Sequence, residues 1–195
     1  MFMGHFATAL VADQKSREQG GTAPFWLFLL ASQFLDFLMV AFLWLGLESV
    51  EPTNFLKATF ANMNVDFSIS HGPGPAVLWG LAFGAFAFLI TRDKWVTLWC
   101  AALVVFHELS DLAVGFTHTV MGKGTAEVGF NLYQNAPVSG LIIETVMCAG
   151  IIFWYLRKRK ATGRPTTALM TWGLYLTLVG GTLATLVRLL TGPQV

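Results

Sequence analysis

Long apolar runs separated by short polar segments form the dominant pattern of this chain. Four runs cover 25–46, 95–116, 138–156 and 168–190, and a shorter one covers 76–91. A helix needs about 20 apolar residues to cross the hydrocarbon of a bilayer. The runs lack the two-residue alternation of a barrel strand, and only helices and closed barrels can span a membrane. The pattern therefore predicts five transmembrane helices, with residues 70–75 able to extend the short one at its start.

The N-terminal stretch 1–12 is apolar but too short to span. We expect it to form a short helix, lying in the interface or half-inserted into the bilayer. If Asp13 marks the membrane surface, His5 lies eight positions deeper, which is about 12 Å at ~1.5 Å per residue. The predicted fold class is an all-α integral membrane protein, a five-transmembrane-helix bundle plus this short N-terminal helix, in a single membrane domain over 1–195.

Composition supports a lipid environment and excludes a nucleic-acid partner. Hydrophobic residues make up 55% of the chain and charged residues 12%, against about 25% charged in soluble domains. A net charge of +1 leaves no broad basic surface for phosphates. Cys100 and Cys148 lie within apolar runs, where thiols usually serve as small packing residues.

The basic residues are distributed unevenly among the segments that join the runs. Under the predicted topology nine lie on the side of the N-terminus and three, Lys57, Lys123 and Arg188, on the other. Lys and Arg are concentrated in cytoplasmic loops. We therefore expect a cytoplasmic N-terminus and an outer C-terminus. The nine are Lys15, Arg17, Arg92, Lys94, Arg157, Lys158, Arg159, Lys160 and Arg164.

Ionisable residues within or beside the runs are the candidates for chemistry, because such groups are costly in hydrocarbon. His107 and Asp111 are four residues apart and so project from one helix face. Imidazole and carboxylate bind zinc and similar divalent ions. The predicted metal ligands, placed in the outer half of the bilayer, are His5, Asp36, His71, His107 and Asp111.

A simpler interpretation stands beside this one. A histidine and an aspartate one turn apart on a membrane helix commonly form a hydrogen-bonded pair that joins helices. Asp36 with Gln33 fits a packing contact in the same way, and Glu144 fits an ion pair with Arg188.

The order of these motifs resembles a known family. Met3-Gly4-His5, Gln33-x-x-Asp36, Ser70-His71 and His107-x-x-x-Asp111 occur between residues 3 and 156 in the order found in bacterial membrane-bound metal-dependent hydrolases, the YdjM-like, LexA-regulated inner-membrane group. The resemblance implies a hydrolase of the bacterial inner membrane. Two positions depart from it: Gly72 replaces a serine, and Gly115 replaces a histidine for which His118 is a possible substitute.

Three functions follow as hypotheses. The first is a metal-dependent hydrolase of an amphiphilic substrate, with a divalent ion such as zinc and with Glu108 or Glu144 as general base. The second is a non-catalytic accessory subunit, with membrane-complex partners or further copies of itself. A transporter or proton relay ranks third, because the chain has no duplicated half.

Overall fold

The computed structural model describes residues 1, 3–53, 59, 60 and 62–191. The helices are α1 (Gly4–Glu18), α2 (Phe25–Ser32), α3 (Phe34–Trp44), α4 (Pro73–Thr91), α5 (Lys94–Val114), α6 (Leu132–Asn135), α7 (Pro137–Ala161), α8 (Ala168–Leu174) and α9 (Gly180–Thr191), with a π-helical segment (Tyr175–Val179) between the last two. Two short antiparallel hairpins lie in the long loops. They pair β1 (Ser49–Glu51) with β2 (Asn64–Asp66), and β3 (His118–Thr119) with β4 (Glu127–Val128).

The long apolar helices identify an integral membrane protein. Within the described residues α4, α5, α7 and the continuous segment Ala168–Thr191 are each long and apolar enough to cross a bilayer. The pair α2 and α3 makes a fifth candidate span only if its two bent halves are counted together. The predicted regions of these five helices are therefore observed, while the count of five spans depends on the bent pair.

The prediction of one unbroken helix over 25–46 is wrong. The chain bends by 53° between α2 and α3, at Gln33, where the backbone leaves helical geometry (φ −112°, ψ 6°). Local polar groups stabilise this break: the Ser32 hydroxyl donates to the Leu29 carbonyl, and the Ser32 carbonyl accepts from a side chain of α5. The break brings polar backbone into the middle of an apolar run.

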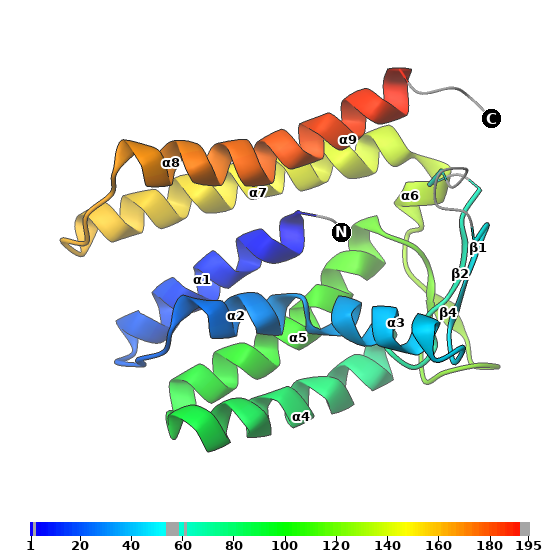
Figure 1. The fold of residues 1–195 in the computed structure, drawn as a ribbon, viewed down its shortest axis with the longest axis horizontal. Coiled ribbons are helices and arrows are strands. Elements are labelled where there is room, and N and C mark those ends of the chain that lie inside the picture. The colour runs from blue at the N-terminus through cyan, green and yellow to red at the C-terminus, as the bar shows by residue number, and fades with distance from the viewer. Residues whose placement is uncertain (2, 54–58, 61, 192–195) are drawn as a thin grey trace.

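Helix α1 is the central element of the bundle and packs among α2, α5 and α7 (Figure 1). Ala7, Ala9 and Ala12 are fully buried, and their small side chains let the neighbouring helices approach closely. The helix expected over residues 1–12 is present and continues to Glu18. Its depth in the bilayer stays a prediction.

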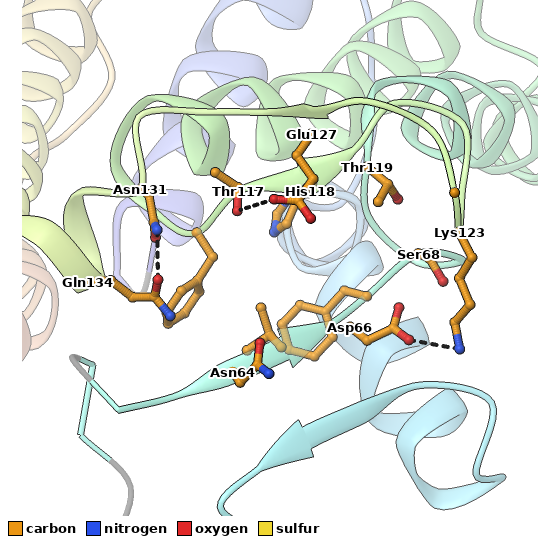
Figure 2. Close-up of a pocket in the computed structure, with 14 residues that line it drawn as sticks. Asn64, Asp66, Ser68, Thr117, His118, Thr119, Lys123, Glu127, Asn131 and Gln134 are labelled. Carbon is orange, nitrogen blue, oxygen red and sulfur yellow. Dashed lines mark hydrogen bonds and ion pairs between the residues drawn. The ribbon is translucent and has the colours of Figure 1, made fainter.

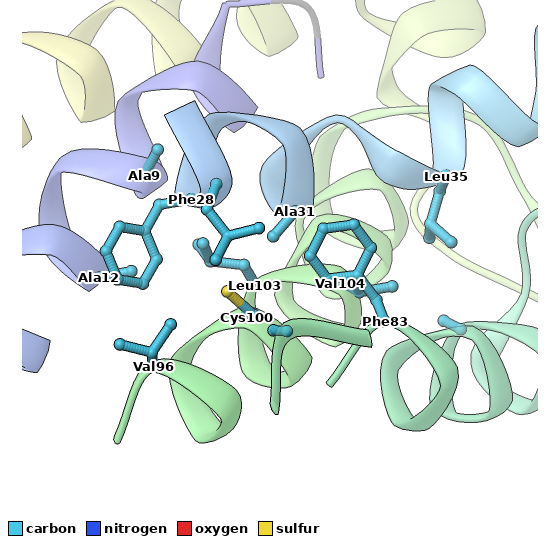
Figure 3. Close-up of a cluster of buried hydrophobic side chains, with 13 residues drawn as sticks. Ala9, Ala12, Phe28, Ala31, Leu35, Phe83, Val96, Cys100, Leu103 and Val104 are labelled. Carbon is cyan, nitrogen blue, oxygen red and sulfur yellow. The ribbon is translucent and has the colours of Figure 1, made fainter. Parts of the chain in front are cut away.

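One apolar core joins α1, α2, α4 and α5 (Figure 3). Leu27 and Phe28 of α2 belong to this buried cluster together with Cys100 and Val104 of α5. Both cysteines are buried and free, as their apolar surroundings predict. Gly80 and Gly84 allow close contact between α4 and α5, since a Cβ on Gly84 would lie 3.0 Å from that of Ala101.

The basic segments gather at one end of the bundle. The turns α1–α2, α4–α5 and α7–α8 lie together at the left of Figure 1, whereas the hairpins and the end of α9 lie at the right. Arg164 pairs with the buried Asp13 of α1 at 3.4 Å, and Lys158 pairs with Glu18 at 3.6 Å. The basic end of α7 and the loop after it therefore anchor α1, in addition to supplying charge.

Candidate metal centre

The structure brings all five predicted ligands together. His5 comes from the start of α1, Asp36 from the first turn of α3 beyond the break, and His71 from just before α4. His107 and Asp111 come from α5. Two overlapping groups have ligand atoms within 4.8 Å of one another: His5, His107 and Asp111, and Asp36, His71 and His107.

The nitrogens of His71 and His107 each lie close to oxygens of both carboxylates. Nε2 of His107 lies 3.3 Å from Asp111 Oδ2 and 3.7 Å from Asp36 Oδ1. Nε2 of His71 lies 3.8 Å from each of the same two oxygens. Ligands at the zinc distances of ~2.0–2.2 Å stand about 3.4 Å apart in a tetrahedron. These separations suit a shared ion and are too long for good hydrogen bonds.

The proton on His107 can be placed from its partner. Nδ1 of this buried ring lies 2.8 Å from the Ser32 carbonyl oxygen, which can only accept, so Nδ1 carries the proton. In the neutral ring Nε2 then presents a lone pair, and it has no hydrogen-bond partner among the described residues. A lone pair facing two carboxylates is unfavourable unless a metal ion or a proton lies between them. The residues present therefore fit a divalent metal ion.

His71 is held by a chain of hydrogen bonds from the β1 hairpin region. Its Nδ1 lies 2.8 Å from the Ser70 hydroxyl, which donates to Glu48 at 2.8 Å. Glu48 also accepts from the main-chain N–H groups of Ile69 and Ser70. Burial raises the pKa of Glu48, and these hydrogen bonds oppose the rise. Glu48 thus orients a candidate metal ligand in the way that outer-shell carboxylates commonly do.

The two departures from the family pattern have structural explanations. Gly72 has φ +108° and packs so closely on the Thr119 carbonyl that a Cβ would collide with it, so only glycine suits this turn. A Cβ at Gly115 would lie 3.2 Å from Asp111 Oδ1. A side chain there would project toward the metal group, and the glycine leaves this direction free.

His5 contacts the other oxygen of Asp111. Its Nε2 lies 3.2 Å from Oδ1, and its ring stacks on that of His107 with centroids 3.5 Å apart. The Met1 amino group also forms an ion pair with Asp111 and lies 2.9 Å from His5 Nε2. His5 forms one of the two candidate ligand groups together with His107 and Asp111, so its predicted role as a ligand is compatible with the structure.

Glu144 fixes the start of α1 instead of pairing with Arg188. One oxygen accepts from the main-chain N–H groups of Met3 and Gly4, and the other accepts from the Tyr133 hydroxyl at 2.9 Å. The carboxylate thus satisfies helix N–H groups that otherwise lack partners. Its predicted role as a general base stays untested, and its contacts are those of an anchor for the turn that carries His5.

Glu108 lies beside a histidine that the motif analysis did not select as a site residue. Its Oε1 is 2.9 Å from Nδ1 of His118 on β3, and both side chains are buried. The His118 ring lies 5.1 Å from that of His71 and lines a polar cavity of about 420 Å³ (Figure 2). The separation of ten residues across a loop gave no periodic signal by which this pair could be found.

Asp36 is the most accessible member of the group. Its side chain is 36% exposed, compared with 10% for Asp111 and at most 2% for the three histidines. A catalytic metal site needs one side open to substrate. Asp36 lies on the accessible side of this group.

Comparison with protein-family models, with curated proteins and with solved structures finds no match for this chain.

Proposed function

We propose that this protein is a membrane-bound metal-dependent hydrolase of an amphiphilic substrate. The observation that carries the proposal is Nε2 of buried His107, which has no hydrogen-bond partner among the residues that the structure describes and faces Asp36 and Asp111 at 3.7 and 3.3 Å. The fixed tautomer and the ligand spacing support a metal ion more strongly than a hydrogen-bonded helix contact.

His107 would hold the ion as the member shared by two groups, one completed by Asp36 and His71 and the other by His5 and Asp111. We propose zinc, because neutral imidazoles and carboxylates are its usual ligands in hydrolytic sites. A bound divalent ion supplies Lewis acidity, which polarises a scissile carbonyl or phosphoryl group and makes water easier to deprotonate.

Glu108 and His118 supply proton transfer in this proposal. With its Nδ1 proton directed at Glu108, neutral His118 has its acceptor at Nε2. A histidine oriented by a carboxylate is a common general base, which later returns the proton to the leaving group. Glu108, which the sequence analysis proposed as the general base, therefore acts through His118 as a positioning residue in this proposal.

The distribution of basic residues and the family resemblance support a location in the bacterial inner membrane, with the metal group toward its outer side. With the basic end of the bundle in the cytoplasm, the metal group and the hairpins lie toward the outer side of a bacterial inner membrane. An accessory subunit or a proton relay would need neither bound metal nor turnover.

The experiment is a chelation and reconstitution assay on the purified full chain. The apoprotein is supplied with Zn²⁺ and offered 4-methylumbelliferyl oleate, an amphiphilic ester, with phosphodiester, amide and glycoside analogues. We expect hydrolysis of one class to require Zn²⁺ and to be lost in Asp111→Asn. A protein that binds Zn²⁺ but turns over no class would contradict the hydrolase.

A further inference from the structure

Two hollows of opposite character meet beside the metal group. The first is the polar cavity of about 420 Å³ between β2, β3 and the start of α6 (Figure 2). The second is an apolar groove of about 650 Å³ along α4. Ser68 and Lys123 line both, so the hollows adjoin at these residues. Each volume lies in the range of small-molecule sites, about 300–1,000 Å³.

The groove opens on a face of α4 suited to lipid. Its walls include Leu78, Trp79 and Ala82 of α4, together with Leu47 and Met121 from the loops. Leu78 is 63% exposed, and α4 is long and apolar enough to span the bilayer. An acyl chain can therefore enter this groove sideways from the surrounding lipid.

The polar cavity has the lining of a site for a hydroxyl-rich group. It presents amides, hydroxyls and carboxylates, with the rings of Phe67 and Phe116 as apolar surface. Amide and carboxylate groups together offer the donors and acceptors that a polyol needs. The polar lining residues are Asn64, Asp66, Ser68, Thr117, His118, Thr119, Lys123, Glu127, Asn131 and Gln134.

Charge in the cavity disfavours an anionic headgroup. Among the described lining residues, Lys123 is the one lysine or arginine. It lies 2.8 Å from Asp66, whose carboxylate neutralises its charge. Glu127 adds a further negative charge. A phosphate group would need surplus positive charge or a bidentate arginine, and the described lining supplies neither.

The junction of the two hollows is close to the proposed reaction site. Ser68 precedes the metal-binding His71 by three residues. His118 lines the cavity and lies against the His71 ring. A molecule with its chain in the groove and its head in the cavity would place the link between them near this histidine pair.

From this arrangement we propose that the combined cavity and groove binds a glycolipid, an amphiphile with an uncharged, hydroxyl-rich head and an acyl chain. This inference rests on the proposed function for the claim that the lipid is the substrate, whereas the binding itself does not require hydrolysis.

Native mass spectrometry of the full chain tests the binding. The probes are monoglucosyl diacylglycerol, phosphatidylglycerol and phosphatidylcholine with identical acyl chains. We expect the glucolipid to bind at least about tenfold more tightly than either phospholipid, a difference of about 1.4 kcal/mol. Equal binding of the three, or preference for either phospholipid, would overturn the proposal.

A matched pair of variants locates the site. Leu78→Trp fills the groove, whereas Leu81→Trp alters a residue of similar exposure, 65%, on the same helix outside the groove. We expect glucolipid selectivity to be lost in the first variant and kept in the second. Identical behaviour of the two would refute the assigned groove.

Metal content measured on the same samples separates the two proposals. Selective binding of the glucolipid by a protein without bound metal would contradict the proposed hydrolase and support the glycolipid site. Stoichiometric metal without selectivity would defeat the glycolipid site alone.

Discussion

Nε2 of His107 faces Oδ2 of Asp111 across 3.3 Å, and in the neutral ring this nitrogen is an acceptor when Nδ1 donates to Ser32. Two acceptors held together in a buried site repel each other unless a cation lies between them. The break between α2 and α3 makes this possible, because it presents the Ser32 carbonyl to the ring.

The carboxylate behind His71 should tune metal affinity without touching the ion. Glu48→Gln weakens the acceptor of the Ser70 hydroxyl, and loss of such outer-shell partners typically costs about 10- to 100-fold in metal affinity. We expect a Zn²⁺ dissociation constant raised by that factor, measured by competition with a chelating dye. Glu51→Gln, at an exposed position on β1, is the control. Equal effects of the two substitutions on Zn²⁺ affinity would refute a role for the hydrogen-bond chain from Glu48 to His71.

The Glu108–His118 pair should act on turnover and leave metal binding intact. Glu108→Gln removes the charge that orients His118, and general bases contribute about 10²- to 10⁴-fold. We expect such a fall in kcat with an unchanged Zn²⁺ dissociation constant. The double variant with His118→Ala should lose no more than His118→Ala alone. Additive losses would show that the residues act independently.

Two substitutions of Glu144 distinguish a structural role, as the anchor of the start of α1, from a catalytic role as general base. Glu144→Ala leaves the Met3 and Gly4 N–H groups without their acceptor and frees the turn that carries His5, so both thermal stability and Zn²⁺ affinity should fall. Glu144→Gln keeps an acceptor oxygen and should retain most of both. If Glu144→Gln bound Zn²⁺ normally but abolished turnover, the carboxylate would be catalytic as first predicted.

Asp93 should stabilise α5 in a pH-dependent way. Burial would raise the pKa of this cap residue, but the main-chain N–H groups of Thr22, Val96 and Trp95 outweigh it and lower the pKa. The stabilisation is therefore complete above the ordinary carboxyl pKa of about 3.9 and is lost as pH falls through the lowered value.

Asp93→Ala should reduce the free energy of unfolding by about 0.5–2 kcal/mol at neutral pH, measured as a fall in melting temperature in detergent. Asp93→Asn keeps a capping oxygen without the titration. The difference in melting temperature between Asp93→Asn and the wild type should therefore shrink below about pH 4. A difference that grew on acidification would contradict the assigned shift.

Hydropathy predicted the helical regions because each span must be apolar over its whole length. It could not predict the bend at Gln33, since breaking a helix here depends on the Ser32 hydroxyl and on a partner 75 residues away. The ligand set was predictable because ionisable residues stand out in apolar runs. The Glu108–His118 pair was not, because a loop conformation brings it together.

Metal analysis of the wild type beside His107→Ala and Asp111→Asn is the most direct test of the account. We predict about one Zn²⁺ per chain in the wild type, with an X-ray absorption spectrum of nitrogen and oxygen ligands at ~2.0–2.2 Å and no sulfur, and loss of the metal in both variants. A wild type purified in the presence of Zn²⁺ that retains none, or variants that bind it as well as the wild type, would contradict the metal centre.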